Sequence, residues 1–168
     1  MTTVARRFLG SVLIASVVGG VTVARAASSR TWVWPTVGPV LRIYDPPATT
    51  YGAGHRGIDI ACARGAPIVA VASGLVTFAG SVGGQRYVTV DHGTGLSSTY
   101  SYLDVVLTRK GATVVAGTAV GICGAGHAGA TIPHVHLGAK RPDGSYEDPL
   151  LLLVPADLTS FVHLAPRR

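Results

Sequence analysis

From residue 55 onwards, the chain is divided into short segments rich in apolar and β-branched residues, and glycine-containing turns separate them. Three of these turns contain Ser73-Gly74, Lys110-Gly111 and Ala116-Gly117, and no segment keeps a helical period of apolar residues over three turns. This punctuation is typical of antiparallel sheets. The sequence therefore predicts an all-β fold, with antiparallel strands in a β-sandwich or barrel-like arrangement and long loops. The expected strands are 58–61, 67–72, 75–79, 87–91, 97–103, 105–107, 114–115, 119–123 and 134–140.

The first 26 residues have the pattern of an export signal. Arg6 and Arg7 precede an apolar run at 8–24, and Ala24-Arg25-Ala26 places small residues around a cleavage position. This order is that of a secretory signal peptide, so we expect a protein that is secreted or located at the cell wall. An uncleaved membrane anchor is the alternative.

The remaining sequence divides into three parts. Residues 27–50 contain several Trp and Pro residues and predict an irregular lead-in with a short extended run at 40–44. Residues 51–155 form the expected domain, in which 150–154 is either a short helical turn or a last strand. Residues 156–168 are expected to be a C-terminal tail.

The charge distribution limits the classes of partner. The chain has 14 Lys+Arg against eight Asp+Glu, and three of the cations, Arg6, Arg7 and Arg25, belong to the expected signal peptide. The others form no basic stripe, which argues against a nucleic-acid partner. After signal cleavage we expect no stable membrane association and a monomer.

The two cysteines, Cys62 and Cys123, both lie in the expected exported part. An even number of cysteines in an oxidising compartment is compatible with one disulfide. Two small buried thiols are the alternative.

Two polar clusters carry the candidate chemistry. One is His55-Arg56-Gly57-Ile58-Asp59 and the other is His134-Val135-His136. Alternate residues of a strand face the same side, so the two histidines of the second cluster can point into one site. In a straight strand His55 and Asp59 would stand about 13 Å apart, and we expect a bend at Gly57 to bring them together. Imidazole and carboxylate are ligands that zinc prefers, whereas each cluster alone could also be a solvated turn or a pair of exposed strand histidines.

With the glycine-rich segment between them, these clusters resemble the LytM/lysostaphin-type M23 family of zinc metallopeptidases, over roughly residues 50–150. Residues 54–61 resemble the HxGxD motif of that family, and residues 133–137 its HxH motif. The segments 65–76, 88–93, 111–117 and 148–150 follow in the order of the family.

The resemblance implies a role for each matched position. His55, Asp59 and His136 would bind Zn²⁺, and His134 would face the attacking water or the tetrahedral intermediate instead of binding the metal. The substrate would be a peptide bond in the stems or cross-bridges of bacterial peptidoglycan.

One position departs from the family pattern. The family usually has a second catalytic histidine in a Tyr-x-His-Leu stretch, and here the stretch reads Tyr100-Ser101-Tyr102-Leu103. A phenol with a pKa of about 10 is chiefly a proton donor, so Tyr102 is expected to donate a hydrogen bond to an oxyanion and to be a poor general base. His127, in the glycine-rich segment 124–129, is a candidate for the wall of the substrate groove.

Two other classes of function stay open at this point. An M23-like domain with weak or no catalysis could bind peptidoglycan or activate another cell-wall hydrolase, and Tyr102 favours this alternative. The segment 110–121 also resembles the turns of biotinyl and lipoyl carrier domains, but that interpretation leaves the two polar clusters unexplained.

Overall fold

The computed structural model describes residues 31–49 and 52–153, so the expected signal peptide, the C-terminal tail and His163 lie outside the described residues. Ten strands and one 3₁₀ turn are present in this part, and no helix in it is long and apolar enough to span a membrane. The elements are β1 (Val40–Arg42), β2 (Ile58–Ala61), β3 (Pro67–Val69), β4 (Gly74–Val82), β5 (Gln85–Asp91), β6 (Ser97–Val106), β7 (Thr113–Val114), β8 (Ala119–Cys123), β9 (His134–Lys140), β10 (Tyr146–Glu147) and η1 (Pro149–Leu151).

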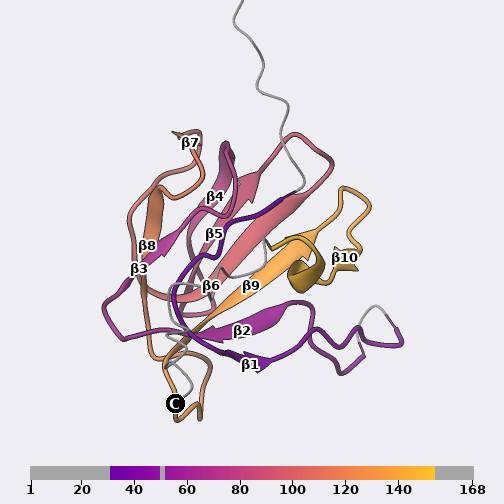
Figure 1. Cartoon of the computed structure of the whole chain (residues 1–168), viewed down its shortest axis with the longest axis vertical. Helices are drawn as coiled ribbons and strands as arrows, with labels where there is room; N and C mark the ends of the chain where they lie inside the picture. The colour runs from indigo at the N-terminus through magenta and orange to yellow at the C-terminus, as the bar shows by residue number, and fades with distance from the viewer. Residues whose placement is uncertain (1–30, 50–51, 154–168) are drawn as a thin grey trace, which may run out of the picture.

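All strand pairings are antiparallel, and they connect the strands into one sheet with the order β1-β2-β9-β6-β5-β4-β7 (Figure 1). Three strands lie off this path, since β10 pairs with β9, β8 pairs with β6, and β3 pairs with β8. The prediction of an antiparallel all-β domain is therefore confirmed.

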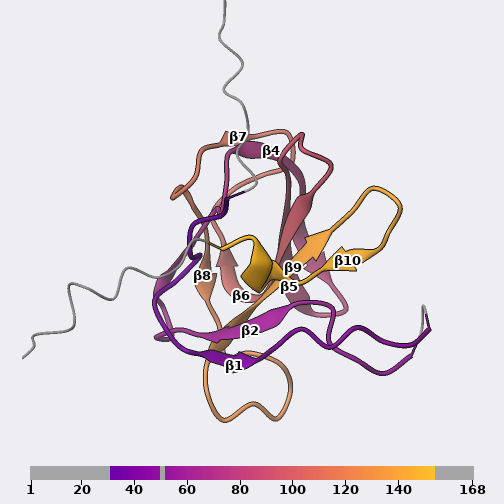
Figure 2. The same cartoon turned by 45° about the vertical axis from the view of Figure 1, so that its right-hand side comes forward.

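The sheet forks along one edge of β6. Residues 97–101 of this strand pair with β9, whereas residues 103–106 pair with β8. Tyr102 stands at the fork and has φ = 65°, the one positive φ among the described residues that are not glycine. The loop 124–133 connects the two branches, and Figure 2 shows it projecting from the end of the sheet beyond β1.

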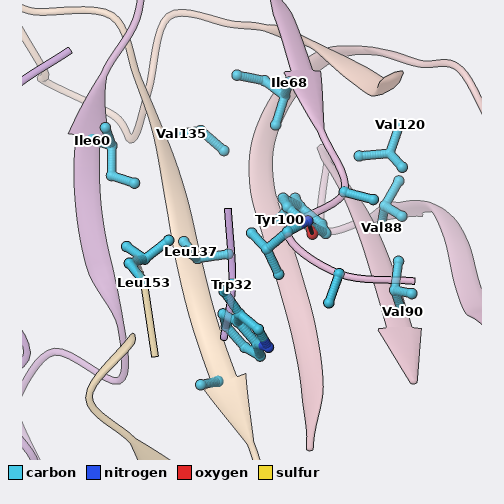
Figure 3. Packing of buried hydrophobic residues seen from close by; sticks show 14 of the residues in the cluster. Trp32, Ile60, Ile68, Val88, Val90, Tyr100, Val120, Val135, Leu137 and Leu153 are labelled. Atoms are coloured by element: carbon cyan, nitrogen blue, oxygen red, sulfur yellow. Dashed lines mark hydrogen bonds between the residues drawn. The ribbon is translucent and has the colours of Figure 1, made fainter. Parts of the chain in front are cut away.

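Alternation along β2 and β9 separates a core face from a polar face. Ile58, Ile60, Val135 and Leu137 are fully buried in the core, and the residues between them are Asp59 and His136. The described part of the lead-in contributes to the same core, since Trp32 is 1% exposed and forms a parallel bridge with Leu153 (Figure 3).

A buried polar network lies beneath the β5–β6 turn. His92 Nδ1 donates to the Ser73 carbonyl oxygen at 2.9 Å, and its Nε2 lies 2.9 Å from the Ser98 hydroxyl. The Ser98 and Tyr100 hydroxyls are 3.0 Å apart, and the Val71 amide donates to the Tyr100 oxygen at 2.7 Å. Burial raises the pKa of Tyr100 to about 12. Burial also lowers the pKa of His92 below its ordinary 6.5, against the opposing effects of the Ser73 carbonyl and the Asp91 charge. His92 is therefore neutral in the folded protein at neutral pH, and its role is structural.

Cys62 and Cys123 form a disulfide with a Cα–Cα distance of 6.2 Å. Of the two alternatives that the sequence left open, the structure has the bridge. It ties the residue after β2 to the last residue of β8, where the loop 124–133 begins.

Several strand boundaries differ from those expected. The segments 97–103 and 105–107 were expected as separate strands, but β6 continues through both because an irregularity between Leu103 and Val105 keeps its pairing with β8. Strand β4 runs past Gly80, which pairs with Tyr87, and the turn falls instead at Gly83 and Gly84, both with positive φ. The expected strand 67–72 ends at Val69.

Candidate metal centre

A single row of the sheet carries most of the candidate site. Asp59 on β2 pairs with Arg42 on β1 and with His136 on β9, and His136 pairs in turn with Ser101 on β6. Residues directly opposite one another in antiparallel strands share a face. The Asp59 carboxylate and the His136 ring therefore lie side by side on the face opposite the core.

His55 reaches this row from outside β2. Its backbone forms an antiparallel bridge with Asp45, and its Nδ1 donates to the Ile43 carbonyl oxygen at 2.8 Å. The Nε2 atom is thereby directed toward the row. A histidine ring fixed by a carbonyl at one nitrogen is the usual arrangement when the other nitrogen is a metal ligand.

Three potential ligand atoms converge at this point. His55 Nε2 is 3.1 Å from Asp59 Oδ1 and 3.0 Å from His136 Nδ1, and the last two atoms are 2.9 Å apart. Ligands of a tetrahedral zinc ion at about 2.05 Å stand about 3.3 Å from one another. The observed triangle needs an expansion of only a few tenths of an ångström to hold such an ion, and the three residues could bind a metal.

The chemistry of the donor set favours a cation at this point. Because Nδ1 of His55 donates to Ile43, the neutral ring has a lone pair at Nε2, and this lone pair faces a carboxylate oxygen. Two acceptors at 3.1 Å repel each other unless a proton or a metal ion lies between them. Two nitrogens and one oxygen also form a set that suits zinc and leaves a fourth position free.

The electrostatics of Asp59 agree with this view. Burial by itself raises the pKa of this carboxyl, but the hydrogen bond from His136 and the charges of His136, His55 and His134 outweigh burial and hold the pKa below its ordinary 3.8. Asp59 is therefore an ionised carboxylate at neutral pH although it is only 3% exposed.

Gly57 is needed here because the backbone comes very close to the site. A Cβ atom at this position would lie 2.7 Å from His136 Nε2 and would also collide with the Leu137 carbonyl oxygen. The sequence predicted a bend that exploits the freedom of glycine. Gly57 is not among the residues with positive φ, so this position does not need the conformational freedom of glycine. It needs a residue without a side chain, because the His136 ring occupies the space where a Cβ atom would lie.

His134 and Tyr102 lie beside the three converging residues. The Tyr102 ring centroid is 5.8 Å from that of His134 and 6.3 Å from that of His136. His134 is buried, and its Nδ1 donates to the Ile132 carbonyl oxygen at 2.9 Å. The structure thus brings together all five residues that the sequence singled out.

A hollow of about 330 Å³ opens in front of the cluster and is lined by Arg42, Gly54, His55, Arg56, Asp59, Tyr102, His127 and His136. Arg42 belongs to no motif that the sequence analysis identified. Its position beside the site becomes evident only from the pairing of β1 with β2. His127 enters the lining as expected for a groove residue. Together with Asp59 and His134 it forms a second group of potential ligands within 4.8 Å of one another.

An antiparallel domain that gathers two imidazoles and a carboxylate at an open hollow is a candidate metal-binding domain. Residues 53–149 match peptidase family M23, and the chain belongs to this family. Membership of this family also excludes the interpretation of the chain as a biotinyl or lipoyl carrier domain.

Three relatives illustrate the range of the family. An uncharacterized protein of Mycobacterium tuberculosis is 38% identical over 140 residues, which are 80% of this chain and 55% of that protein. The murein hydrolase activator NlpD of Escherichia coli is 33% identical over 115 residues, or 66% of this chain and 28% of NlpD. The catalytic domain of the antimicrobial peptidase lysostaphin from Staphylococcus simulans is 25% identical with a TM-score of 0.57, over 68% of this chain and 90% of that domain. The chain spans about half the length, or less, of the curated relatives that it matches.

Proposed function

We propose that this protein is a zinc-dependent endopeptidase that hydrolyses peptide bonds in the stems or cross-bridges of bacterial peptidoglycan. The observation that carries the proposal is the convergence of His55 Nε2, Asp59 Oδ1 and His136 Nδ1 on one point at the floor of an open hollow. Family M23 is zinc-dependent and acts on peptidoglycan, and lysostaphin is named a peptidase.

His55, Asp59 and His136 would hold the ion. When bound, zinc lowers the pKa of a water molecule and polarises the scissile carbonyl. Asp59 on β2 and His136 on β9 are held by the pairing of these two strands. His55 is held by its backbone bridge to Asp45 and by the hydrogen bond of its ring to the Ile43 carbonyl. This rigidity keeps the positions of the ligands fixed and leaves the side toward the hollow for substrate.

His134 is the proposed proton carrier. Its Nδ1 hydrogen is donated to Ile132, so the lone pair of the neutral ring is at Nε2. The His127 backbone amide makes only a long contact of 3.4 Å with this atom, and the attacking water would take its place. The oxygen of the attacking water bonds to the carbonyl carbon, and Nε2 takes one proton from that water. The same proton passes to the amide nitrogen as the C–N bond breaks. An amine and a carboxylic acid that keeps the second proton of the water are released, and the acid then loses this proton to solvent.

Tyr102 is the proposed hydrogen-bond donor to the carbonyl oxygen. Burial, followed by the effects of Tyr87 and Asp59, raises the pKa of its phenol, while Arg42 opposes this. The hydroxyl therefore stays protonated at neutral pH and can donate as negative charge develops on the oxygen.

The disulfide supports a location outside the cytoplasm, because such bridges persist in oxidising compartments. Peptidoglycan is the substrate that such a location offers to this family. Secretion through residues 1–26 remains part of the proposal.

The test is digestion of purified peptidoglycan by zinc-loaded protein with and without a chelator, with product masses and new amine termini as the readout. We expect about one zinc ion per chain, peptide cleavage that the chelator abolishes, and loss of both metal and cleavage in Asp59→Asn. Asp104→Asn is the matched control, since Asp104 is exposed on β6 and outside the hollow. His134→Ala should keep the zinc and lose cleavage, and loss of the metal in this variant would contradict its assignment as a non-ligand.

A second candidate is a peptidoglycan-binding or hydrolase-activating module. Tyr102 at the position of the usual histidine favours it, as does the similarity to NlpD, which is named an activator. Zinc-loaded protein that binds peptidoglycan, releases no products and stimulates another hydrolase would establish this function instead of the first.

A further inference from the structure

The loop 124–133 is built around His134. Gly126 has φ = +90°, and a Cβ atom there would collide with the His134 ring, so only glycine lets the backbone lie against this imidazole. The next residue, His127, donates its backbone amide to His134 Nε2 at 3.4 Å. The loop is therefore positioned by the same histidine that the mechanism uses.

This arrangement fixes the side chain of His127 at the mouth of the site. The ring centroid of His127 is 4.9 Å from that of His134 and 6.1 Å from that of Tyr102, and both pairs meet edge to face. With the distance of 5.8 Å between Tyr102 and His134, the three rings form a compact triangle. In its Nδ1–H tautomer His127 donates to the Ala128 carbonyl oxygen at 3.0 Å, and this contact is exposed, so water can replace it. Nε2 is directed to another partner, as an acceptor in this tautomer and as a donor in the other.

His127 also faces the solvent space that a substrate would enter. Its side chain is exposed, and it lines the hollow of about 330 Å³ in front of the metal centre. It lines a second hollow of about 440 Å³ as well, which shares Arg42 and Asp59 with the first and reaches His134. A solvated loop histidine would need neither the glycine at 126 nor contacts to two rings of the site.

We propose that His127 is a catalytic residue of this protein. In the Nε2–H tautomer, which gives up the exposed contact of Nδ1 with the Ala128 carbonyl, its ring donates a hydrogen bond to the oxygen of the scissile carbonyl alongside Tyr102. It thus places an imidazole beside the phenol of Tyr102, from a different element of the fold. The inference rests on the proposed peptidase function. No covalent bond to His127 is made or broken, because the residue acts by stabilising charge on the oxygen.

The experiment compares wild type with His127→Ala, His127→Gln and the double variant His127→Ala/Tyr102→His. Each zinc-loaded protein is tested for metal content, thermal unfolding, and kcat and KM on a peptide that wild type cleaves. A phosphinic peptide, whose tetrahedral phosphorus oxygen mimics the developing oxyanion, provides a binding readout by calorimetry. We expect His127→Ala to keep its zinc, to lower kcat about 100-fold with little change in KM, and to weaken phosphinate binding by a similar factor.

The other two variants separate catalysis from loop structure. Gln keeps an N–H donor, so His127→Gln should retain more activity than His127→Ala, and the histidine of the double variant should restore part of the lost kcat. An unchanged kcat in His127→Ala, a defect in KM alone, or no rescue in either variant would overturn the inference while the proposed function stands. A second zinc ion that is lost in His127→Ala would overturn it too, by making His127 a ligand. Wild-type protein that binds zinc and cleaves nothing would refute the proposed function itself.

Discussion

Removal of the disulfide should have a large effect on stability. The bridge joins residues 61 positions apart, and both cysteines are buried. The variant to use is Cys62→Ala/Cys123→Ala, since alanine leaves no buried hydroxyl without a partner.

The magnitude follows from the length of the loop that the bridge closes. For a separation of 61 residues, the chain-entropy relation gives about 4 kcal/mol at 25 °C. Measured values are commonly somewhat lower, and we expect a loss of about 2 to 4 kcal/mol. With a urea m-value of about 1.5 kcal/mol/M for a domain of this size, the midpoint of unfolding should fall by roughly 2 M.

The assay is equilibrium urea unfolding in a chelator, so that metal binding does not contribute. Wild type with a reducing agent should behave like the alanine variant, and the reducing agent should not change the variant itself. A difference between oxidised and reduced wild type below about 0.5 kcal/mol would refute the loop-closure argument. Two reactive thiols in the unreduced, unfolded protein would refute the bridge.

Three further predictions concern single residues. Gly57→Ala should displace the His136 ring and weaken zinc binding at least about tenfold, which competition with a chromogenic chelator would detect and an unchanged affinity would contradict. The stability of His92→Gln should depend less on pH than that of wild type. The unfolded state binds a proton at His92 from pH 6.5 downward whereas the native state binds it only at lower pH, so wild type should lose up to about 1.4 kcal/mol per pH unit as the pH falls below 6.5. Urea unfolding at several pH values in a chelator measures this, and parallel curves for the two proteins would exclude His92 as the cause. Tyr102→Phe should keep its zinc and turn over about 10- to 100-fold more slowly, whereas an unchanged rate would remove the phenol from the mechanism.

The strands were predictable where hydrophobic alternation and turn glycines agree. The segments 58–61, 119–123 and 134–140 coincide with β2, β8 and β9, because apolar residues alternate there or run continuously between clear turns. The continuity of β6 through Asp104 was not predictable, since it depends on pairing with two different neighbours. The short strand β10 was also missed, because it exists only through its pairing with the end of β9.

The candidate site was predictable in its residues but not in its geometry. The two clusters and the resemblance pointed to His55, Asp59, His136, His134 and Tyr102, and the structure gathers all of them. The positive φ of Tyr102 is a property of the fork, and a tyrosine in this conformation costs about 1 kcal/mol or more. The sequence around Tyr102 does not indicate a left-handed backbone conformation.

The geometry of the metal centre follows from burial of apolar side chains on the opposite face. Ile58 and Ile60 on β2 and Val135 and Leu137 on β9 are fully buried, and their packing selects the register that sets Asp59 opposite His136. A shift of one residue would turn both histidines of β9 toward the core and expose the valine and leucine, at a cost of several kcal/mol. The candidate ligands on these two strands are thus held by the hydrophobic core, and a metal ion would complete an arrangement that the chain has already made. Only His55 depends on a loop, and its bond to the Ile43 carbonyl supplies the restraint that the strands give to the other two.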